Sequence, residues 1–270
     1  MACGGMTSST SGPRSVISQA VTLPEWESLL RRFPVAAPDL ILARDLMRRT
    51  DLKFIVSPSE AAGLLPALEG EYARLTAGNG PVAAYRTLYF DTPELELFHA
   101  HRRGRRVRHK VRVRHYPDRR LTLLEVKTRR SELETSKIWK EREYGDDALR
   151  PEDQWFVSDH TGIDRDVLPQ AWTHFRRVTL LGLNLIERVT IDFDLVVSGE
   201  GHSRALDQVA IVEVKQRPFV PGSPVLVALR GAGRRPGWAS KYCAAIAFTR
   251  SGVRLNTLLP GLRELERRAA

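Results

Sequence analysis

The chain has 270 residues, of which 42% are hydrophobic, and it carries a formal net charge of +10 at pH 7. This length is enough for one large core, and the excess of positive charge favours a polyanionic ligand such as a nucleotide, nucleic acid or anionic lipid. The apolar runs are shorter than the roughly 20 residues of a membrane span, and the N-terminus lacks the apolar core of a secretory signal, so we expect a soluble, cytoplasmic protein with no membrane segment.

Residues 1–20 are rich in Gly, Ser and Thr and show no hydrophobic period, which predicts a disordered leader. We expect the rest, residues 21–270, to form a single domain. The first elements predicted in it are a short helix over 24–33 and a strand over 52–56.

A strong helix start follows this strand. Ser57 is suited to the N-cap, Pro58 to the first helical position and Glu60 to a capping box. The helix is predicted to run to about Leu75, with a kink at Pro66 because proline has no N–H to donate.

From Val82 onward the hydrophobic pattern changes to period two, which is typical of strands. The predicted strands cover 83–90, 106–116, 121–129, 137–144, 186–197 and 209–217. Short turns between them favour antiparallel neighbours. Two more helices are predicted over 240–248 and 260–268, so the fold class is α+β.

Several of these strands have a cationic face and an apolar face. In 106–116 the even positions are basic and odd positions carry valines: Arg106, Arg108, Lys110, Arg112 and Arg114 against Val107, Val111 and Val113. The same alternation places Glu125, Lys127 and Arg129 on one face of 121–129, Glu213, Lys215 and Arg217 on one face of 209–217, and Arg188, Asp192 and Asp194 on one face of 186–197.

A single strand of this kind is most simply a half-buried strand whose charged face is in water. Taken together, the strands crowd like charges on neighbouring positions, which is destabilising unless a counterion is bound. If the sheet closes into a barrel with flanking helices, the cations line its interior and a polyanion relieves their repulsion.

Six segments in this order resemble the polymerase domain of the vacuolar transporter chaperone (VTC) family. They are YRTLYFDTPELELFHAHRRGRRVRHKVRVR (85–114), LLEVKTRR (123–130), SKIWKER (136–142), ERVTIDFDL (187–195), IVEVKQ (211–216) and SKYC (240–243). The resemblance covers about 45–249. That family belongs to the CYTH-like triphosphate tunnel metalloenzymes, so the resemblance implies a closed antiparallel β-tunnel. It also implies synthesis of inorganic polyphosphate from ATP with a divalent metal, usually Mn²⁺ (or Mg²⁺).

Matching the motifs residue by residue implies a set of site residues. The catalytic cations would be Lys53, Arg112, Arg114, Lys127, Lys140, Arg177, Arg188 and Lys241. Further substrate-binding cations would be Lys110, Lys137, Arg142 and Lys215, and Glu213 would be the metal ligand. The chain departs from the family at Asp51, where many relatives have glutamate, and at Trp238, where the eukaryotic polymerases have a second lysine.

Two other functions share these residues. One is a triphosphatase or nucleotide hydrolase on the same fold, and the other is a non-catalytic module that binds polyphosphate or RNA. RNA binding favours aromatic side chains among the cations, and between residues 101 and 120 only Tyr116 qualifies, so nucleic acid is the less favoured partner. Cys3 and Cys243 lack the spacing of a zinc site or a disulfide framework.

Overall fold

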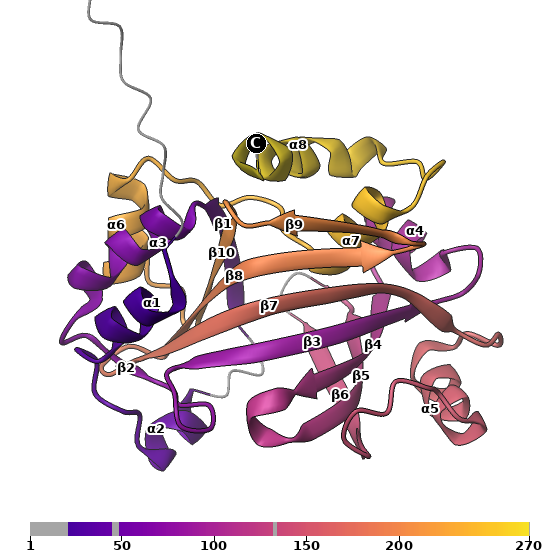
Figure 1. The fold of residues 1–270 in the computed structure, drawn as a ribbon, viewed down its shortest axis with the longest axis horizontal. Helices are drawn as coiled ribbons and strands as arrows, with labels where there is room; N and C mark the ends of the chain where they lie inside the picture. The colour runs from indigo at the N-terminus through magenta and orange to yellow at the C-terminus, as the bar shows by residue number, and fades with distance from the viewer. Residues whose placement is uncertain (1–20, 45–48, 132–133, 270) are drawn as a thin grey trace, which may run out of the picture.

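The computed structural model describes residues 21–44, 49–131 and 134–269. The leader predicted for residues 1–20 lies outside this described part. Within it, one antiparallel sheet of ten strands organises the fold, together with flanking helices (Figure 1). The α+β class expected from the sequence is confirmed.

The sheet path starts with strands from both ends of the chain. Its order is β1 (Thr50–Val56), β10 (Ala210–Gln216), β8 (Glu187–Gly199), β7 (Leu168–Gly182), β3 (Val82–Asp91), β4 (Arg108–Tyr116), β5 (Leu121–Arg129) and β6 (Thr135–Arg142). Two short strands lie off this path: β2 (Tyr72–Arg74) pairs with β7, and β9 (His202–Leu206) pairs with β8. The path therefore ends at β1 and β6.

The helices cover the sheet in three groups. The first group contains α1 (Leu23–Leu30), α3 (Pro58–Leu64) and α6 (Pro224–Gly231), the second α4 (Glu96–Arg102), α7 (Lys241–Thr249) and α8 (Leu259–Ala269), and the third α5 (Pro151–Thr161) alone. A further helix, α2 (Pro38–Ala43), lies near β2, and three short 3₁₀ turns, η1 (Leu65–Leu68), η2 (Pro117–Arg119) and η3 (Asn256–Leu258), complete the elements. Among the described residues, no helix is long and apolar enough to cross a membrane.

The period-two alternation places the apolar face of each strand in a core. Val111 and Val113 of β4 are fully buried with Leu124 and Val126 of β5 in the core beside α5. Val212 and Val214 of β10 are buried in the core beside α1 and α3. The opposite faces of these strands carry the cations, as the sequence predicts.

The helix that starts after β1 is shorter than expected. Its start is confirmed: the Glu60 N–H donates to Ser57 Oγ at 3.1 Å, and Glu60 Oε2 accepts the Ser57 N–H at 2.7 Å. The predicted extension to Leu75 is wrong, because α3 ends at Leu64 and η1 ends at Leu68. Pro66 cannot donate a helical hydrogen bond, and Gly70 adopts a φ of +79°, which turns the chain into β2.

The longest strand, β7, was not predicted. Its register shifts between His174 and Arg176, and residues 178–182 are buried throughout, so the alternation is interrupted and then lost. Opposite this irregularity Asp194 has a φ of +50° and contacts Arg176 at 3.4 Å. The expectation that Asp194 shares the face of Asp192 is therefore wrong.

Candidate functional site

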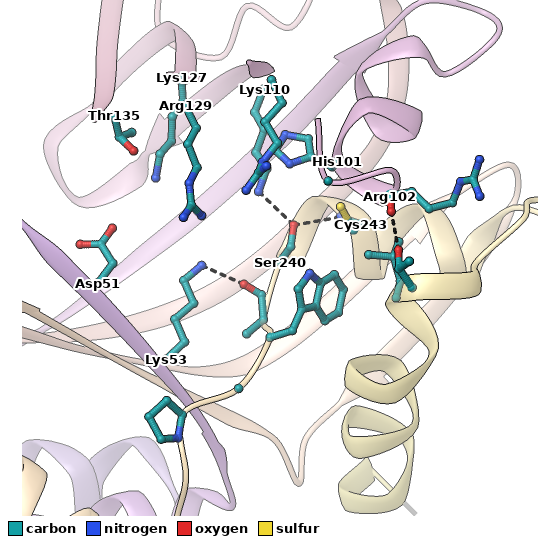
Figure 2. A pocket seen from close by; sticks show the side chains of 18 of the residues that line it. Asp51, Lys53, His101, Arg102, Lys110, Lys127, Arg129, Thr135, Ser240 and Cys243 are labelled. Carbon is teal, nitrogen blue, oxygen red and sulfur yellow. Dashed lines mark hydrogen bonds between the residues drawn. The ribbon is translucent and has the colours of Figure 1, made fainter. Parts of the chain in front are cut away.

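A cavity of about 620 Å³ is lined by cations from three strands. Lys53 comes from β1, Arg108 and Lys110 from β4, and Lys127 and Arg129 from β5. Figure 2 shows the side chains of Lys53, Lys110, Lys127 and Arg129 pointing toward one another across the cavity. Because β1 and β5 lie near opposite ends of the sheet path, the sheet curls so that its two ends face each other.

The segment before α7 lies between these strands and is held from both sides. Lys53 Nζ donates to the Ala239 carbonyl at 2.8 Å, and Lys110 Nζ donates to Ser240 Oγ at 2.9 Å (Figure 2). Ser240 also caps α7 through the Cys243 N–H at 3.3 Å. The first turn of α7 is therefore positioned at the cavity by the same lysines that line it.

Two lysines of this cavity have depressed pKa values. Burial, followed by repulsion from Lys53, lowers the pKa of Lys127 to about 7. Burial, together with repulsion from Lys53 and Arg112, lowers the pKa of Lys110 to about 8. Both side chains would gain from a nearby negative charge, because an anion favours their protonated forms.

We expect Lys127→Met to stabilise the protein at pH 7 and to weaken metal-free triphosphate binding about tenfold or more. The pKa of Lys127 is about 7 in the folded state and 10.5 in the unfolded state, so the unfolded protein binds more protons at any pH between these values. The buried lysine therefore destabilises the fold most near pH 7, and this effect shrinks as the pH rises toward 10.5. Melting temperature at pH 7 and 9.5 and calorimetric titration check both effects. Lys140→Met, on the opposite face of the neighbouring strand, is the control and should leave affinity unchanged.

A second cavity of about 240 Å³ lies toward the other end of the same face. It is lined by Arg114, Arg119, Lys137, Arg177 and Arg188, together with Tyr85 and Tyr116. Because residues two apart on a strand share a face, Lys110, Arg112 and Arg114 lead from the first cavity to the second along β4.

An aromatic pair supports three of these cations. Tyr85 stacks on Phe175 with ring centroids 5.0 Å apart. The guanidinium carbons of Arg114 and Arg177 lie 5.3 and 5.0 Å from the Tyr85 centroid, and Lys241 Nζ lies 4.5 Å from that of Phe175. Cation–π attraction thus orients these groups without neutralising them.

Buried carboxylates pair with several cations of this face, including two that lie on the aromatic pair. Glu125 is 0% exposed and contacts Arg112 at 2.5 Å and Lys137 at 3.2 Å. Asp192 is 3% exposed, bonds Arg177 Nη2 at 2.7 Å and also contacts Lys241. Burial would raise the pKa of both carboxyls, but these cations hold it well below the usual range. The cationic inner face of the curled sheet, called the lumen below, thus carries cations with fixed counter-charges beside Lys110 and Lys127, which contact no carboxylate among the described residues.

Glu213 is the carboxylate suited to a metal. Its Oε2 accepts Lys215 Nζ at 2.6 Å, and its Oε1 lies 4.0 Å from Lys53. Burial would raise its pKa, but Lys215 and Lys53 keep the carboxyl ionised. No cluster of three or more His, Cys, Asp or Glu side chains that could hold a metal occurs in the described part of the chain. One carboxylate still fits Mg²⁺ or Mn²⁺ when substrate phosphates supply the other ligands.

Residues 48–250 match the family described as "VTC domain", which is most of the chain. The chain belongs to the VTC domain family. No curated protein matches it.

Solved structures similar to this VTC domain have low identity. A Hippeastrum protein described as having a dominant triphosphatase activity is 15% identical, with a TM-score of 0.44 over 76% of this chain and 98% of its own. A Pyrococcus horikoshii protein is 13% identical, with a TM-score of 0.38 over 75% of this chain and 99% of its own. These values are too low to support an inference about activity.

Two of the expected site residues of this VTC domain are not brought to the lumen. Lys140 Nζ contacts Asp153 of α5 at 3.1 Å, and Arg142 contacts Asp153 and, at 2.6 Å, Asp146. These contacts lie on the outer face of β6, whereas Lys137 reaches Glu125 on the inner face. The odd spacing between Lys137 and Lys140 already places them on opposite faces of a strand. The remaining residues of the expected set lie along the lumen.

The two departures from the family pattern have separate roles. Asp51 lines the first cavity and accepts a hydrogen bond from Arg49 Nε at 2.7 Å. Trp238 lines the same cavity and packs against Gly261 of α8, where an added Cβ would lie 2.3 Å from the indole. The tryptophan thus supports the docking of α8 at a position where a lysine would offer a charge.

Sequence reasoning missed four residues of this site. Glu125 and Asp192 stand in the matched motifs, but their pairing with Arg112 and Arg177 depends on strand register. Tyr85 and Phe175 come together because β3 pairs with β7, with these two residues directly opposite. Because β7 was not predicted as a strand, the contact between Tyr85 and Phe175 could not be predicted either.

Proposed function

We propose that this VTC domain is a polyphosphate polymerase, which transfers the γ-phosphate of ATP to the end of a growing inorganic phosphate chain. The observation that carries the proposal is the convergence of Lys53, Lys110 and Lys127 from three strands on one cavity, where burial and mutual repulsion lower the pKa values of Lys110 and Lys127. A chain of phosphates supplies a negative charge at regular spacing, which suits cations placed along strands.

We further propose that the sheet forms a closed tunnel and that residues 21–270 are one domain. The described strand pairs run from β1 to β6 without pairing those two, so hydrogen bonding alone leaves the path open. Support for closure comes from the side chains, since Lys53 of β1 and Lys127 of β5 line one cavity. A bound polyanion would draw these two ends of the sheet together.

The arginines and lysines of the lumen have different roles in phosphoryl transfer. Arg114, held over Tyr85, and Arg177, held by Asp192, present planar guanidinium groups that can each grip two phosphate oxygens. Lysines such as Lys53 and Lys127 act as movable point charges, which suits a chain that must advance. Arg188, Lys215 and Lys241 extend the positive lining beside these groups.

The attacking group is an acceptor phosphate oxygen that is already ionised, so positioning and charge stabilisation suffice and no protein nucleophile is required. Glu213 would hold Mn²⁺ or Mg²⁺ against the phosphates, and the bound metal would neutralise negative charge there. The protein's own task is to keep donor and acceptor phosphates in line between Arg114, Arg177 and the lysines.

Incubation of the purified protein with ATP and Mn²⁺ is expected to yield ADP and an acid-labile phosphate polymer, resolved by gel electrophoresis. Orthophosphate as the sole phosphate product would identify a hydrolase. Tight triphosphate binding with no turnover would identify a binding module. Either result contradicts the polymerase proposal.

A further inference from the structure

A separate basic cavity lies between the end of α4 and the segment after α7. It has a volume of about 420 Å³. Figure 1 shows α4 beside α7 at this end of the molecule. The charged and titratable residues that line it are Glu94, His99, Arg102, Arg103, Arg250 and Arg254.

Two of these charges have partners within the protein. Glu94 contacts Arg165 at 3.4 Å, a cation outside the lining set that also contacts Glu96 at 3.3 Å. Arg250 contacts Glu200 at 2.7 Å and donates to Gln170 at 2.7 Å. Arg102, Arg103 and Arg254 have no acidic partner within residues 21–44, 49–131 and 134–269. Three uncompensated guanidinium groups therefore face one cavity.

Two buried nitrogen atoms in this cluster also lack partners. His99 Nδ1 and Arg102 Nε are buried nitrogens with no hydrogen-bond partner among the described residues. Such atoms are uncommon in folded proteins, because leaving them unsatisfied costs free energy. Burial, followed by repulsion from Arg102, Arg103 and Arg254, lowers the pKa of His99, which lines the same cavity as these arginines. The cluster has an excess of positive charge, with one acid, Glu94, among four lining arginines.

The C-terminal end of α4, where the helix dipole is negative, does not balance this positive charge. The carbonyl oxygens of His99 and His101 accept hydrogen bonds from the backbone N–H groups of Arg103 and Gly104, at 2.9 and 3.1 Å respectively. The Arg102 carbonyl oxygen accepts a hydrogen bond from the hydroxyl group of Thr257. Because these carbonyl oxygens already accept hydrogen bonds within the protein, this end of α4 presents mainly side-chain hydrogen-bond donors to the cavity. The cavity is therefore suited to an external anion.

This cavity is adjacent to the lumen but distinct from it. Arg102 and Arg103 line both cavities, whereas His99, Arg250 and Arg254 line only the outer one. In Figure 2 the Arg102 side chain extends away from Lys110 and Lys127. An anion bound by Arg102 and Arg254 would therefore lie outside the lumen.

We propose that this arginine cavity is a second binding site for an inorganic phosphate chain, outside the lumen. Arginine forks hold phosphate oxygens in pairs, and three of them match the several oxygens of a short oligophosphate. The site needs no metal and no catalytic step. It therefore stands whether the lumen acts as a polymerase or as a hydrolase.

Calorimetric titration with sodium triphosphate in EDTA is expected to show two classes of site on the wild-type protein. Arg254→Gln removes an arginine that lines only the outer cavity, and it should weaken the outer class about tenfold or more. It should retain the lumen class. Lys127→Met should show the converse, with the lumen class weakened and the outer class intact.

The matched control is Arg263→Gln on α8, an exposed arginine that loses the same charge away from both cavities. It should leave both classes unchanged, and circular dichroism should show unaltered melting of the arginine variants. A single class of site on the wild type, an outer class that Arg254→Gln leaves unchanged, or loss of the lumen class in Arg254→Gln overturns the second site. Absence of polymer synthesis by the wild type would instead count against the proposed function.

Discussion

Asp192→Asn is expected to lower the free energy of unfolding by about 3–5 kcal/mol, because it leaves two buried cations without their counter-charge. Asp192 is 3% exposed, and the side chains of its partners Arg177 and Lys241 are 17% and 12% exposed. Urea unfolding monitored by circular dichroism measures the change. On this scale, melting should fall by on the order of 10 °C.

The pH dependence of the Asp192 effect has a definite sign. Arg177 and Lys241 depress the pKa of Asp192 from its usual 3.8, so the carboxylate stabilises the fold above that pH and loses its effect as the pH falls through the folded value. The difference between wild type and Asp192→Asn should therefore be full at neutral pH and shrink only in strong acid. Triphosphate should stabilise Asp192→Asn more than wild type, since it can replace the missing charge.

Asp194→Asn is the matched control on the same strand. Its side chain is 50% exposed and contacts Arg176 at 3.4 Å, so its replacement should cost only about 0–1 kcal/mol. Equal destabilisation by the two asparagine variants would show that the buried Arg177–Asp192–Lys241 cluster does not hold this part of the lumen together.

Glu213→Gln is expected to reduce Mn²⁺-dependent turnover by about 100-fold or more, the size of effect that loss of a metal's charge stabilisation produces. Metal-free triphosphate affinity should stay equal or increase, because a negative charge leaves an anion-binding lumen. Electron paramagnetic resonance of Mn²⁺ in the presence of triphosphate should show weaker metal binding. This readout does not depend on turnover.

A structural effect of the same substitution must be separated from the metal effect. Glu213 bonds Lys215 at 2.6 Å, and the two side chains are 13% and 12% exposed, so some loss of stability is expected on either view. Turnover is therefore compared at a temperature where melting curves show both proteins folded. Glu152→Gln, an exposed glutamate of α5, serves as the control and should match wild type in all three measurements. Near-normal turnover in Glu213→Gln would contradict the assignment of Glu213 as a metal ligand.

The start of α3 and the cationic strand faces could be read from the sequence because they are local properties. A capping box involves residues three apart, and period-two alternation follows from the backbone of one strand. Thus the capping of α3 by Ser57, the bounds 121–129 of β5 and the opposition of Lys110 to Val111 are as predicted. The same parity also separates Lys140 from Lys137, although motif matching alone had grouped them.

What only the tertiary structure decided is which charges meet. Arg112 and Lys127 look alike in the sequence, yet Glu125 neutralises Arg112, while Lys127 is set beside Lys53 and has a depressed pKa. The arginine cavity likewise joins α4 to residues 250–254, which are far apart in the chain. The burial and ion pairing of these side chains depend on strand register and on the packing of segments distant in the sequence. They therefore cannot be predicted from the hydrophobic pattern of one segment. The alternation of side chains along each strand needs only the strand itself.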